Sequence, residues 1–424
     1  SCSTDVGRTT IEKWPDGKRA AVSITFDGGT TNQFAMARPI MDELGLPATF
    51  FIVTGDIKGS EFRRTFIGRP VAEIADEVTR GVPTTEDNFF ERAGAVRMLP
   101  YREAIDYHTR AGDLFELGRI EEAYATIDEA YRRADEGSLT TLEPGDGPDN
   151  PDVNATWNDL SSYASRGHEF ASHSVSHAQL ATLDSLNLIY ELERSLEEIE
   201  THLGTKHTFS VEAPYGTENP RVMERVLALY PASRNRMPEA YLEEINRWND
   251  ADPRESPQEY VQWQRGPKSA TSVREMISWV DRAASADNVW LVLVFHGVEG
   301  IGWEPKPAAE LQEYFTYIAG SDEVWVGTFG DAARYIRERM AATVTATRRG
   351  DEIRVDLRHS LDSDLYRFPL TLSTRVPADW TFVEVTQGAS RHLVDVRRSS
   401  REGSVTYRAV PNSDVVVLRQ ATGT

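Results

Sequence analysis

The sequence contains a single cysteine, Cys2, so no disulfide can form within the chain. It also has no run of eighteen apolar residues, the length that a transmembrane helix needs. Basic residues are few, because 46 lysines and arginines stand against 67 aspartates and glutamates, for a formal net charge of −21. This charge argues against nucleic acid and anionic membrane surfaces as partners, since both would be repelled.

Two apolar segments near the N-terminus indicate buried strands separated by a helix. Residues 20–27 form an apolar run that ends abruptly in Asp27, followed by two glycines. A helix over 31–44 and a second apolar strand over 47–54 follow, which makes a strand, helix, strand unit. Catalytic residues of barrels built from such units lie at the carboxyl ends of the strands, which is where Asp27 falls.

Two histidines four residues apart, His173 and His177, have a spacing that suits a metal. Neutral imidazoles at positions i and i+4 of one helical turn can converge on one divalent cation, and histidine is the commonest side-chain ligand of zinc. A third histidine, His296, is the first polar residue after the apolar run 289–295, which predicts a fully buried strand. At such a strand end, His296 can serve as a general acid near neutral pH.

Four motifs, in this order, resemble those of the polysaccharide deacetylases, the NodB-type carbohydrate esterases of family four. The family's Thr-Phe-Asp-Asp-Gly is similar to residues 25–29, its His-Ser/Thr-x-x-His to 173–177, its Arg-x-Pro-Tyr/Phe to 212–215 and its Leu-x-His to 294–296. The resemblance covers about half the chain, residues 15–58 and 155–340. It implies an α/β fold, a distorted (β/α) barrel of the NodB type, that removes acetyl groups from an acetylated polysaccharide or oligosaccharide.

The resemblance also implies a role for each motif residue. Asp27 falls on the catalytic base, and His296 falls on the acid that protonates the leaving group. His173 and His177 fall on metal ligands; the metal, zinc or else cobalt, nickel or manganese, would polarise the acetyl carbonyl. The backbone amide of Tyr215 would help to stabilise the oxyanion.

Two positions depart from the family's pattern. Gly28 replaces an aspartate that is a metal ligand in the family, so we expect Asp27 to serve as the third ligand beside the two histidines. A weaker site of two histidines and water, or no metal site, are the alternatives. Glu212 replaces the arginine that orients the base, whereas Pro214 is kept. Arg234, near the end of the next predicted strand, is a candidate to supply the missing positive charge and to face the substrate.

The rest of the sequence predicts additions to the barrel. Residues 1–14 are expected to be an N-terminal tail, and 59–154 a mainly helical insertion, because apolar residues recur at three- and four-residue steps in its middle. Short alternating segments over 341–424 predict an antiparallel β-sandwich. The insertion leaves the barrel near its catalytic edge, so we interpret it as a lid or substrate wall; a decoration remote from the site is the alternative.

The N-terminal residues indicate export. The chain opens Ser1-Cys2-Ser3 without an initiator methionine, as if a signal segment had been removed. A cysteine behind a small residue resembles the lipidated residue of bacterial lipoproteins. We therefore expect a periplasmic, cell-surface or secreted protein, with Cys2 as the candidate position of a lipid anchor.

Three functions stay open from the sequence. The first is a metal-dependent carbohydrate deacetylase, acting on N- or O-linked acetyl groups. The second is a degenerate barrel that binds glycan without catalysis, and the third is a hydrolase of a non-sugar amide. Retention of Asp27 together with the histidines of both motifs favours an enzyme, because a purely binding barrel has no physical need for an acid and a base at facing strand ends.

Overall fold

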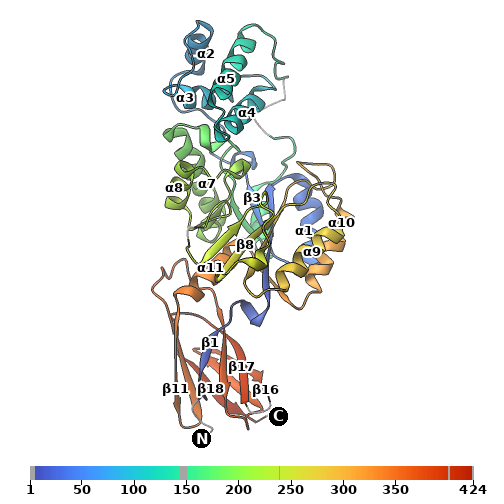
Figure 1. Ribbon diagram of the computed structural model, residues 1–424, viewed down its shortest axis with the longest axis vertical. Coiled ribbons are helices and arrows are strands. Elements are labelled where there is room, and N and C mark those ends of the chain that lie inside the picture. Colours follow the sequence, from blue (N-terminus) through green and yellow to red (C-terminus); the bar gives the residue numbers. More distant parts are fainter. Residues whose placement is uncertain (1–4, 144–149, 238, 400–401, 423–424) are drawn as a thin grey trace.

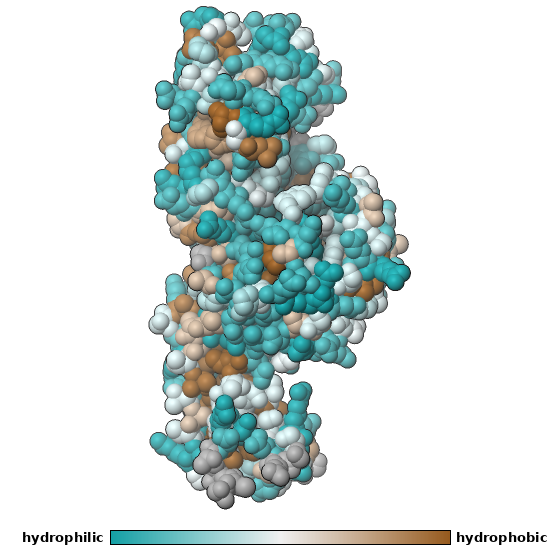
Figure 2. Space-filling view, viewed as in Figure 1, coloured by the Kyte–Doolittle hydropathy of each residue, from teal (hydrophilic) through white to brown (hydrophobic). Residues whose placement is uncertain are grey.

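The computed structural model describes residues 5–143, 150–237, 239–399 and 402–422. The molecule is elongated and has three lobes (Figure 1): a helical lobe at one end, a barrel in the middle and a lobe of antiparallel strands at the other end, where both chain termini lie. Hydrophilic residues cover most of the visible face in every lobe (Figure 2). None of the described helices is both long and apolar enough to cross a membrane.

Parallel strands form the central lobe and follow one another in sequence order around it. Their order is β6-β5-β4-β3-β2-β9-β8-β7, and β10 pairs with the first residues of β2. Within the described residues β6 and β7 form no ladder, so the barrel is open at that seam. The predicted α/β fold, a distorted barrel of the NodB type, is confirmed. The strands are β2 (Ala20–Gly28), β3 (Ala48–Ile52), β4 (Glu169–Ser172), β5 (Ser210–Val211), β6 (Ala232–Ser233), β7 (Leu242–Ile245), β8 (Tyr260–Arg265), β9 (Val289–Phe295) and β10 (Val324–Val326).

Both faces of the barrel strands are buried, which explains why they read as continuous apolar runs. In β2, Val22, Ile24 and Phe26 belong to the core beneath the surrounding helices. Ala21 faces the other way, into a second core that contains Trp290 and Phe329. Because side chains alternate along a strand, Asp27 lies on the same face as Ala21. The surrounding helices are α1 (Arg38–Leu44), α6 (Trp157–Ala164), α7 (Ser185–Leu203), α8 (Pro220–Leu229), α9 (Val273–Ala284) and α10 (Ala308–Ala319). Helix α11 (Phe329–Ala341) instead packs into the second core.

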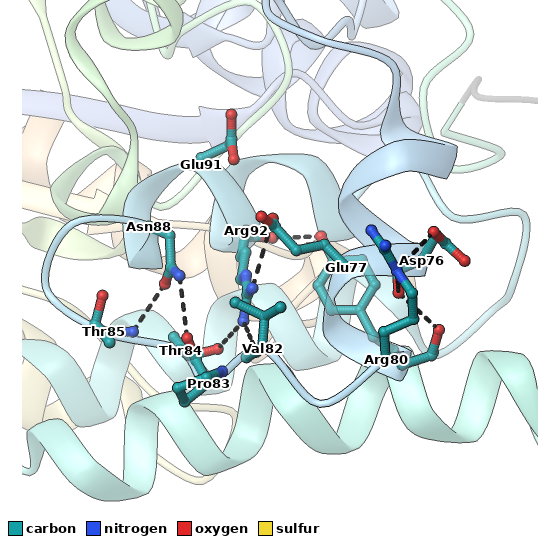
Figure 3. A network of polar contacts seen from close by, with 12 residues as sticks. Asp76, Glu77, Arg80, Val82, Pro83, Thr84, Thr85, Asn88, Glu91 and Arg92 are labelled. Carbon is teal, nitrogen blue, oxygen red and sulfur yellow. Dashed lines mark hydrogen bonds and ion pairs between the residues drawn. The ribbon is translucent and has the colours of Figure 1, made fainter.

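The helical lobe is the predicted insertion, and it has a small core of its own. Its helices are α2 (Val71–Thr79), α3 (Phe89–Val96), α4 (Ala104–Glu116) and α5 (Ile120–Asp135). Arg92 of α3 is fully buried and donates to the Val82 carbonyl and to Thr84 Oγ1, both at 2.9 Å (Figure 3). Its guanidinium also lies 3.5 Å from Glu77, so one side chain ties the α2–α3 loop to both helices.

The insertion is held to the barrel by polar contacts of α3 and α4. His108 is buried; its Nδ1 lies 2.7 Å from the Ala93 carbonyl oxygen, and its Nε2 accepts from the Gln179 amide at 2.9 Å. Arg97 donates to Ser176 Oγ at 2.8 Å. These contacts place the insertion beside the turn that carries the two motif histidines.

The third lobe is the predicted antiparallel sandwich, with one addition. A four-stranded sheet has the order β1-β13-β17-β16 and a five-stranded sheet the order β11-β12-β18-β14-β15, with a shared apolar core. The N-terminal segment, expected as a tail, contributes β1, which pairs with β13 across more than 360 residues of sequence. The strands are β1 (Thr9–Ile11), β11 (Thr343–Arg349), β12 (Glu352–Arg358), β13 (Leu370–Val376), β14 (Phe382–Gln387), β15 (Ser390–Asp395), β16 (Arg397–Ser399), β17 (Glu402–Ala409) and β18 (Val416–Ala421).

The docking of the insertion should weaken in acid through His108. Burial lowers the pKa of His108 to about 3, below its value of 6.5 in the unfolded chain. Neutral His108 therefore contributes stability that is present above pH 6.5 and lost as the pH falls toward 3. Between pH 7 and 5 we expect a loss of roughly 2 kcal/mol from this group. Urea unfolding at both pH values should show a larger loss for the wild type than for His108→Gln; equal losses would contradict the assignment.

Candidate active site

Five side chains meet at one edge of the barrel because each lies at or just after the carboxyl end of a parallel strand. Asp27 is in β2, His173 follows β4, Glu212 follows β5, Arg234 follows β6 and His296 follows β9. All of them except Arg234 line a cavity of about 1070 Å³. The structure thus brings together predicted site residues that are up to 269 positions apart in the sequence.

Arg234 holds two carboxylates at the floor of this cavity. Its Nη1 and Nη2 donate to Oδ1 and Oδ2 of Asp27 at 2.7 and 2.6 Å, a bidentate pair. The same Nη2 lies 3.1 Å from Glu212 Oε1, and Nη1 also donates to Thr25 Oγ1 at 2.8 Å. The Arg234 guanidinium stacks on the ring of Phe51, 4.8 Å from its centroid. Arg234 therefore lies where a charge that orients Asp27 has to lie.

The shared guanidinium and the burial give the two acids very different pKa values. Burial alone would raise the pKa of Asp27, but Arg234 and His296 hold it well below its usual range, so Asp27 is ionised at neutral pH. Burial raises the pKa of Glu212 to about 7 in spite of Arg234. Two neighbouring carboxyl groups with well-separated pKa values are characteristic of sites that handle protons.

His296 lies directly beside Asp27. Its Nε2 is 3.3 Å from Asp27 Oδ2, and its ring meets the edge of Trp303 at 4.8 Å between centroids. Gln33 connects the ends of β2 and β9, because its side-chain amide donates to the backbone oxygens of Asp27 at 2.7 Å and His296 at 2.8 Å. Gln33 begins a π-helical turn, Gln33–Ala37, ahead of α1. Such turns are frequent at functional sites.

The two motif histidines do not lie on a helical turn, and that expectation was wrong. They follow β4 in a turn in which Ser174 and His177 have φ angles of 69° and 57°. His173 Nδ1 lies 2.8 Å from the Glu212 carbonyl oxygen, and the ring centroids of His173 and His177 are 4.8 Å apart. Burial lowers the pKa of His173 to about 4 and that of His177 to about 3. Both imidazoles are thus neutral at pH 7, the form that binds metals.

The described residues do not form a metal site with three protein ligands. No three histidine, cysteine, aspartate or glutamate side chains among them are grouped so that they could hold one ion. Asp27, expected as the third ligand, has both oxygens bonded to Arg234. His173 and His177 remain as a pair of neutral imidazoles, which fits a metal only if other ligands complete the coordination.

Gly28 has a backbone conformation that explains why no side chain stands there. Its φ is +100°, a region that residues with a Cβ rarely adopt. Space is not the obstacle, because the nearest neighbour of a Cβ at this position, Thr30 Cγ2, would be 3.8 Å away. A side chain at this position would therefore be strained by the backbone of this chain.

The third motif forms a tight turn at the cavity rim. Pro214–Gly216 is a 3₁₀ turn in which Tyr215 has a φ of 63°. The Tyr215 hydroxyl lies 3.2 Å from His177 Nδ1 and 3.1 Å from Thr109 Oγ1 of α4. The predicted oxyanion residue is thus fixed between the histidine turn and the insertion.

Sequence reasoning missed Gln33, which bonds the two strand ends, and several residues that line the cavity. Gln33 could have been suspected as a polar residue at the start of an amphipathic helix, but no motif marks the lining residues. These additional lining residues are Arg247, Trp248 and Trp303 from barrel loops, and Ile105, Asp113 and Leu142 from the insertion.

Comparison with known proteins identifies the domain. Residues 145–230 match the family model described as polysaccharide deacetylase, a stretch that includes the histidine motif and the third motif. Residues 145–230 belong to a polysaccharide deacetylase domain. The predicted family resemblance is confirmed over this segment, which carries two of the four motifs.

More distant likenesses extend beyond the matched segment. A gellan lyase from Bacillus sp. is 26% identical over 273 residues, which is 60% of this chain but 11% of that protein, so the chain spans only about a tenth of this curated relative. A family 4 carbohydrate esterase from Bacillus anthracis overlaps 78% of this chain and 86% of its own at 13% identity, with a TM-score of 0.34. One from Bacillus subtilis overlaps 78% and 84% at 12% identity, with a TM-score of 0.33. The assignment of the deacetylase domain rests on the family match.

Removing Arg234 should destabilise the deacetylase domain strongly. Arg234→Gln leaves two buried acids without their partner, which typically costs 3–5 kcal/mol for a buried pair, roughly the scale we expect here. The double variant Arg234→Gln/Asp27→Asn should lose less than the single variant, because the stranded charge is gone. Denaturant unfolding of the two proteins measures the difference, and a double variant less stable than Arg234→Gln would argue against the ion pair.

Placing the family's aspartate at position 28 should cost stability. Gly28→Asp and Gly28→Ala should each lose about 1–2 kcal/mol of stability, because both place a Cβ at a positive φ. Thermal unfolding in the presence of chelator measures this cost. If Gly28→Asp alone is as stable as the wild type, the backbone conformation is not what excludes the side chain.

Proposed function

We propose that the deacetylase domain hydrolyses acetyl groups, N- or O-linked, of a polysaccharide or oligosaccharide. The observation that carries the proposal is the adjacency of Asp27, held by Arg234, and His296 at the floor of a 1070 Å³ cavity. An ionised carboxylate and an imidazole within 3.3 Å can take a proton from water and return it to a leaving group. The cavity is large enough to take several sugar rings.

In this proposal Asp27 is the base and His296 the acid. Asp27 takes a proton as the water oxygen adds to the acetyl carbonyl carbon. Because its pKa is held well below the usual range, Asp27 is a weak base and does not retain this proton. His296 receives it across 3.3 Å and donates it to the amine or alkoxide as the carbon–nitrogen or carbon–oxygen bond breaks, which releases acetate.

Positioning in this reaction comes from the neighbouring strand ends. Arg234 fixes both oxygens of Asp27, so the lone pairs that remain point away from the guanidinium. The backbone amide of Tyr215 is the proposed oxyanion donor, and Pro214 ahead of it sets the tight turn. Trp248 and Trp303 are 70% and 55% exposed on the lining, which suits stacking against sugar rings.

A divalent metal, zinc or else cobalt, nickel or manganese, stays a prediction from the motifs. If one binds, His173 and His177 would be its protein ligands, and it would supply polarisation of the acetyl carbonyl. The described side chains do not fit a third protein ligand, so the steps above run through the chain's own residues alone.

The insertion is proposed as a wall of the substrate site. Ile105, Asp113 and Leu142 of the insertion line the same cavity as the barrel residues, and Thr109 contacts Tyr215. This placement favours a wall over a decoration remote from the site.

Export of the protein stays a prediction. A lipid anchor also stays a prediction, because Cys2 lies outside the described residues.

A glycan-binding protein without catalysis is the second candidate. Gly28 favours it, as does the lack of a third metal ligand among the described side chains, whereas the Asp27–His296 pair favours the enzyme. Hydrolysis of a non-sugar amide uses the same side chains, so the substrate panel must separate it from glycan deacetylation.

Acetate release from acetylated glycans tests the proposal. Chelator-treated protein, with and without added zinc, cobalt or nickel, should release acetate from at least one N- or O-acetylated oligosaccharide. Asp27→Asn and His296→Gln should each lower turnover by roughly 10²–10⁴-fold, because each removes one proton-transfer group. Matched controls are Asp322→Asn, beside β10 at the opposite end of the barrel, and His392→Gln in the sandwich, which should keep full activity.

The outcomes separate the candidates. Release that requires added metal would support a site in which water completes the coordination. Release only from simple acetamides would favour the non-sugar amide hydrolase. Glycan binding without any acetate release, under every metal condition, would favour the non-catalytic protein.

A further inference from the structure

The sandwich lobe carries the opposite charge from the rest of the chain. Residues 341–424 contain twelve arginines, no lysine and ten acidic residues, for a net charge of +2. Since the whole chain carries −21, the other 340 residues carry −23. A charge asymmetry of this kind between lobes indicates different partners for each.

Three of these twelve arginines line a pocket at the outer face of the four-stranded sheet. Arg375 of β13, Ser404 of β17 and Arg397 of β16 face one another across three strands, so their side chains share one face. Arg8 extends the row, because its carbonyl accepts from the Arg375 amide at 2.9 Å. The row lies in a shallow pocket of about 450 Å³, lined by Arg8, Thr10, Ser373, Arg375, Arg397, Arg398, Ser399, Glu402, Gly403 and Ser404.

Two of these arginines have unused guanidinium groups. Arg375 is paired with Asp5 and, at 3.1 Å, with Glu402, and Arg398 donates to the Trp380 carbonyl and Thr381 Oγ1. By contrast, the side chains of Arg8 and Arg397 make no hydrogen bond or ion pair with any residue that the structure describes. Neighbouring arginines without a counter-ion repel each other, and a bound anion would relieve that repulsion.

We propose that this pocket binds the carboxylate groups of an acidic glycan. Arginine presents a planar fork that matches a carboxylate, and the hydroxyls of Thr10, Ser373 and Ser404 can bond to sugar hydroxyls. The described residues of the lining include no aromatic side chain on which nucleic acid bases could stack, and no apolar side chain to enter a lipid layer. The choice of a glycan as the bearer of the carboxylate rests on the proposed function of the deacetylase domain.

The negative charge of the whole molecule does not prevent this binding. At physiological ionic strength charges are screened beyond about 8 Å, so a ligand in the pocket senses mainly the adjacent arginines. A second site on the same chain would hold the polymer on the molecule that carries the cavity and raise its local concentration there. The sandwich then acts as a tether for the substrate polymer.

Binding of polygalacturonate to the full chain tests the proposal. Affinity electrophoresis or calorimetry should detect binding to polygalacturonate and much weaker binding to its fully methyl-esterified form, which has the same backbone without the charge. Arg8→Gln/Arg397→Gln should weaken binding about tenfold or more, because two charged contacts are lost. The control Arg349→Gln/Arg367→Gln changes the net charge equally at exposed arginines outside the pocket and should bind as the wild type does.

Several results would overturn the proposal. These are equal binding of the esterified polymer, equal weakening by the control variant, and stronger binding to single-stranded DNA or to phosphatidylglycerol vesicles than to polygalacturonate. Acetate release by Arg8→Gln/Arg397→Gln from a short acetylated oligosaccharide should match the wild type. Because that assay reads the cavity alone, failure of the deacetylase proposal and failure of the tether are seen separately.

Discussion

The buried guanidinium of Arg234 holds the candidate site together, because it bonds side chains from two other strand ends. Arg234 is 1% exposed and bonds Asp27, Glu212 and Thr25, which belong to two other strand ends. A buried charge of either sign lowers the stability of the fold when it has no partner, and two buried acids without the arginine would lower it further. The cluster is therefore stable only when all three strand ends are in register. This constraint fixes Asp27 beside His296 through the protein's own side chains.

Asp27 is bonded by an arginine from a different strand end than the one at which the motif of the family would place it. In the family's pattern the arginine stands at the start of the third motif, where this chain has Glu212. Here Arg234 follows β6, and Glu212, at the motif position of the arginine, is an acid that pairs with it. Arginine is long enough to reach Asp27 from either strand, because neighbouring strands lie only about 4.8 Å apart. Such a difference alters the sequence motif, but the pairing of an arginine with Asp27 remains.

Strand positions and site membership could be predicted, whereas local conformations could not. Apolar runs marked β2 and β9 because both faces of these strands are buried, and polar residues at their ends marked Asp27 and His296. The histidine turn was mispredicted, since the i, i+4 spacing is shared by a helix and by a turn with left-handed residues. Strand β1 has three residues and a partner near residue 373, so no local signal reveals it. The bonding of Arg234 to both acids could not be predicted, because the three residues lie far apart in the sequence and meet only in the folded barrel.

The same residue type serves opposite purposes in the two lobes, and the difference lies in how completely its donors are used. Arg234 has its terminal nitrogens bonded to side chains of the fold, so it is part of the structure and has little left to offer a ligand. Arg8 and Arg397 are exposed and make no such bonds within the described chain, so their donors remain for an external anion. In a strongly acidic protein, arginines that pair with no acid among the described residues run against the average composition. Because carboxylates are abundant in this chain, two arginines on one sheet face that pair with none of the described acids are a reason to look for a ligand that carries a carboxylate.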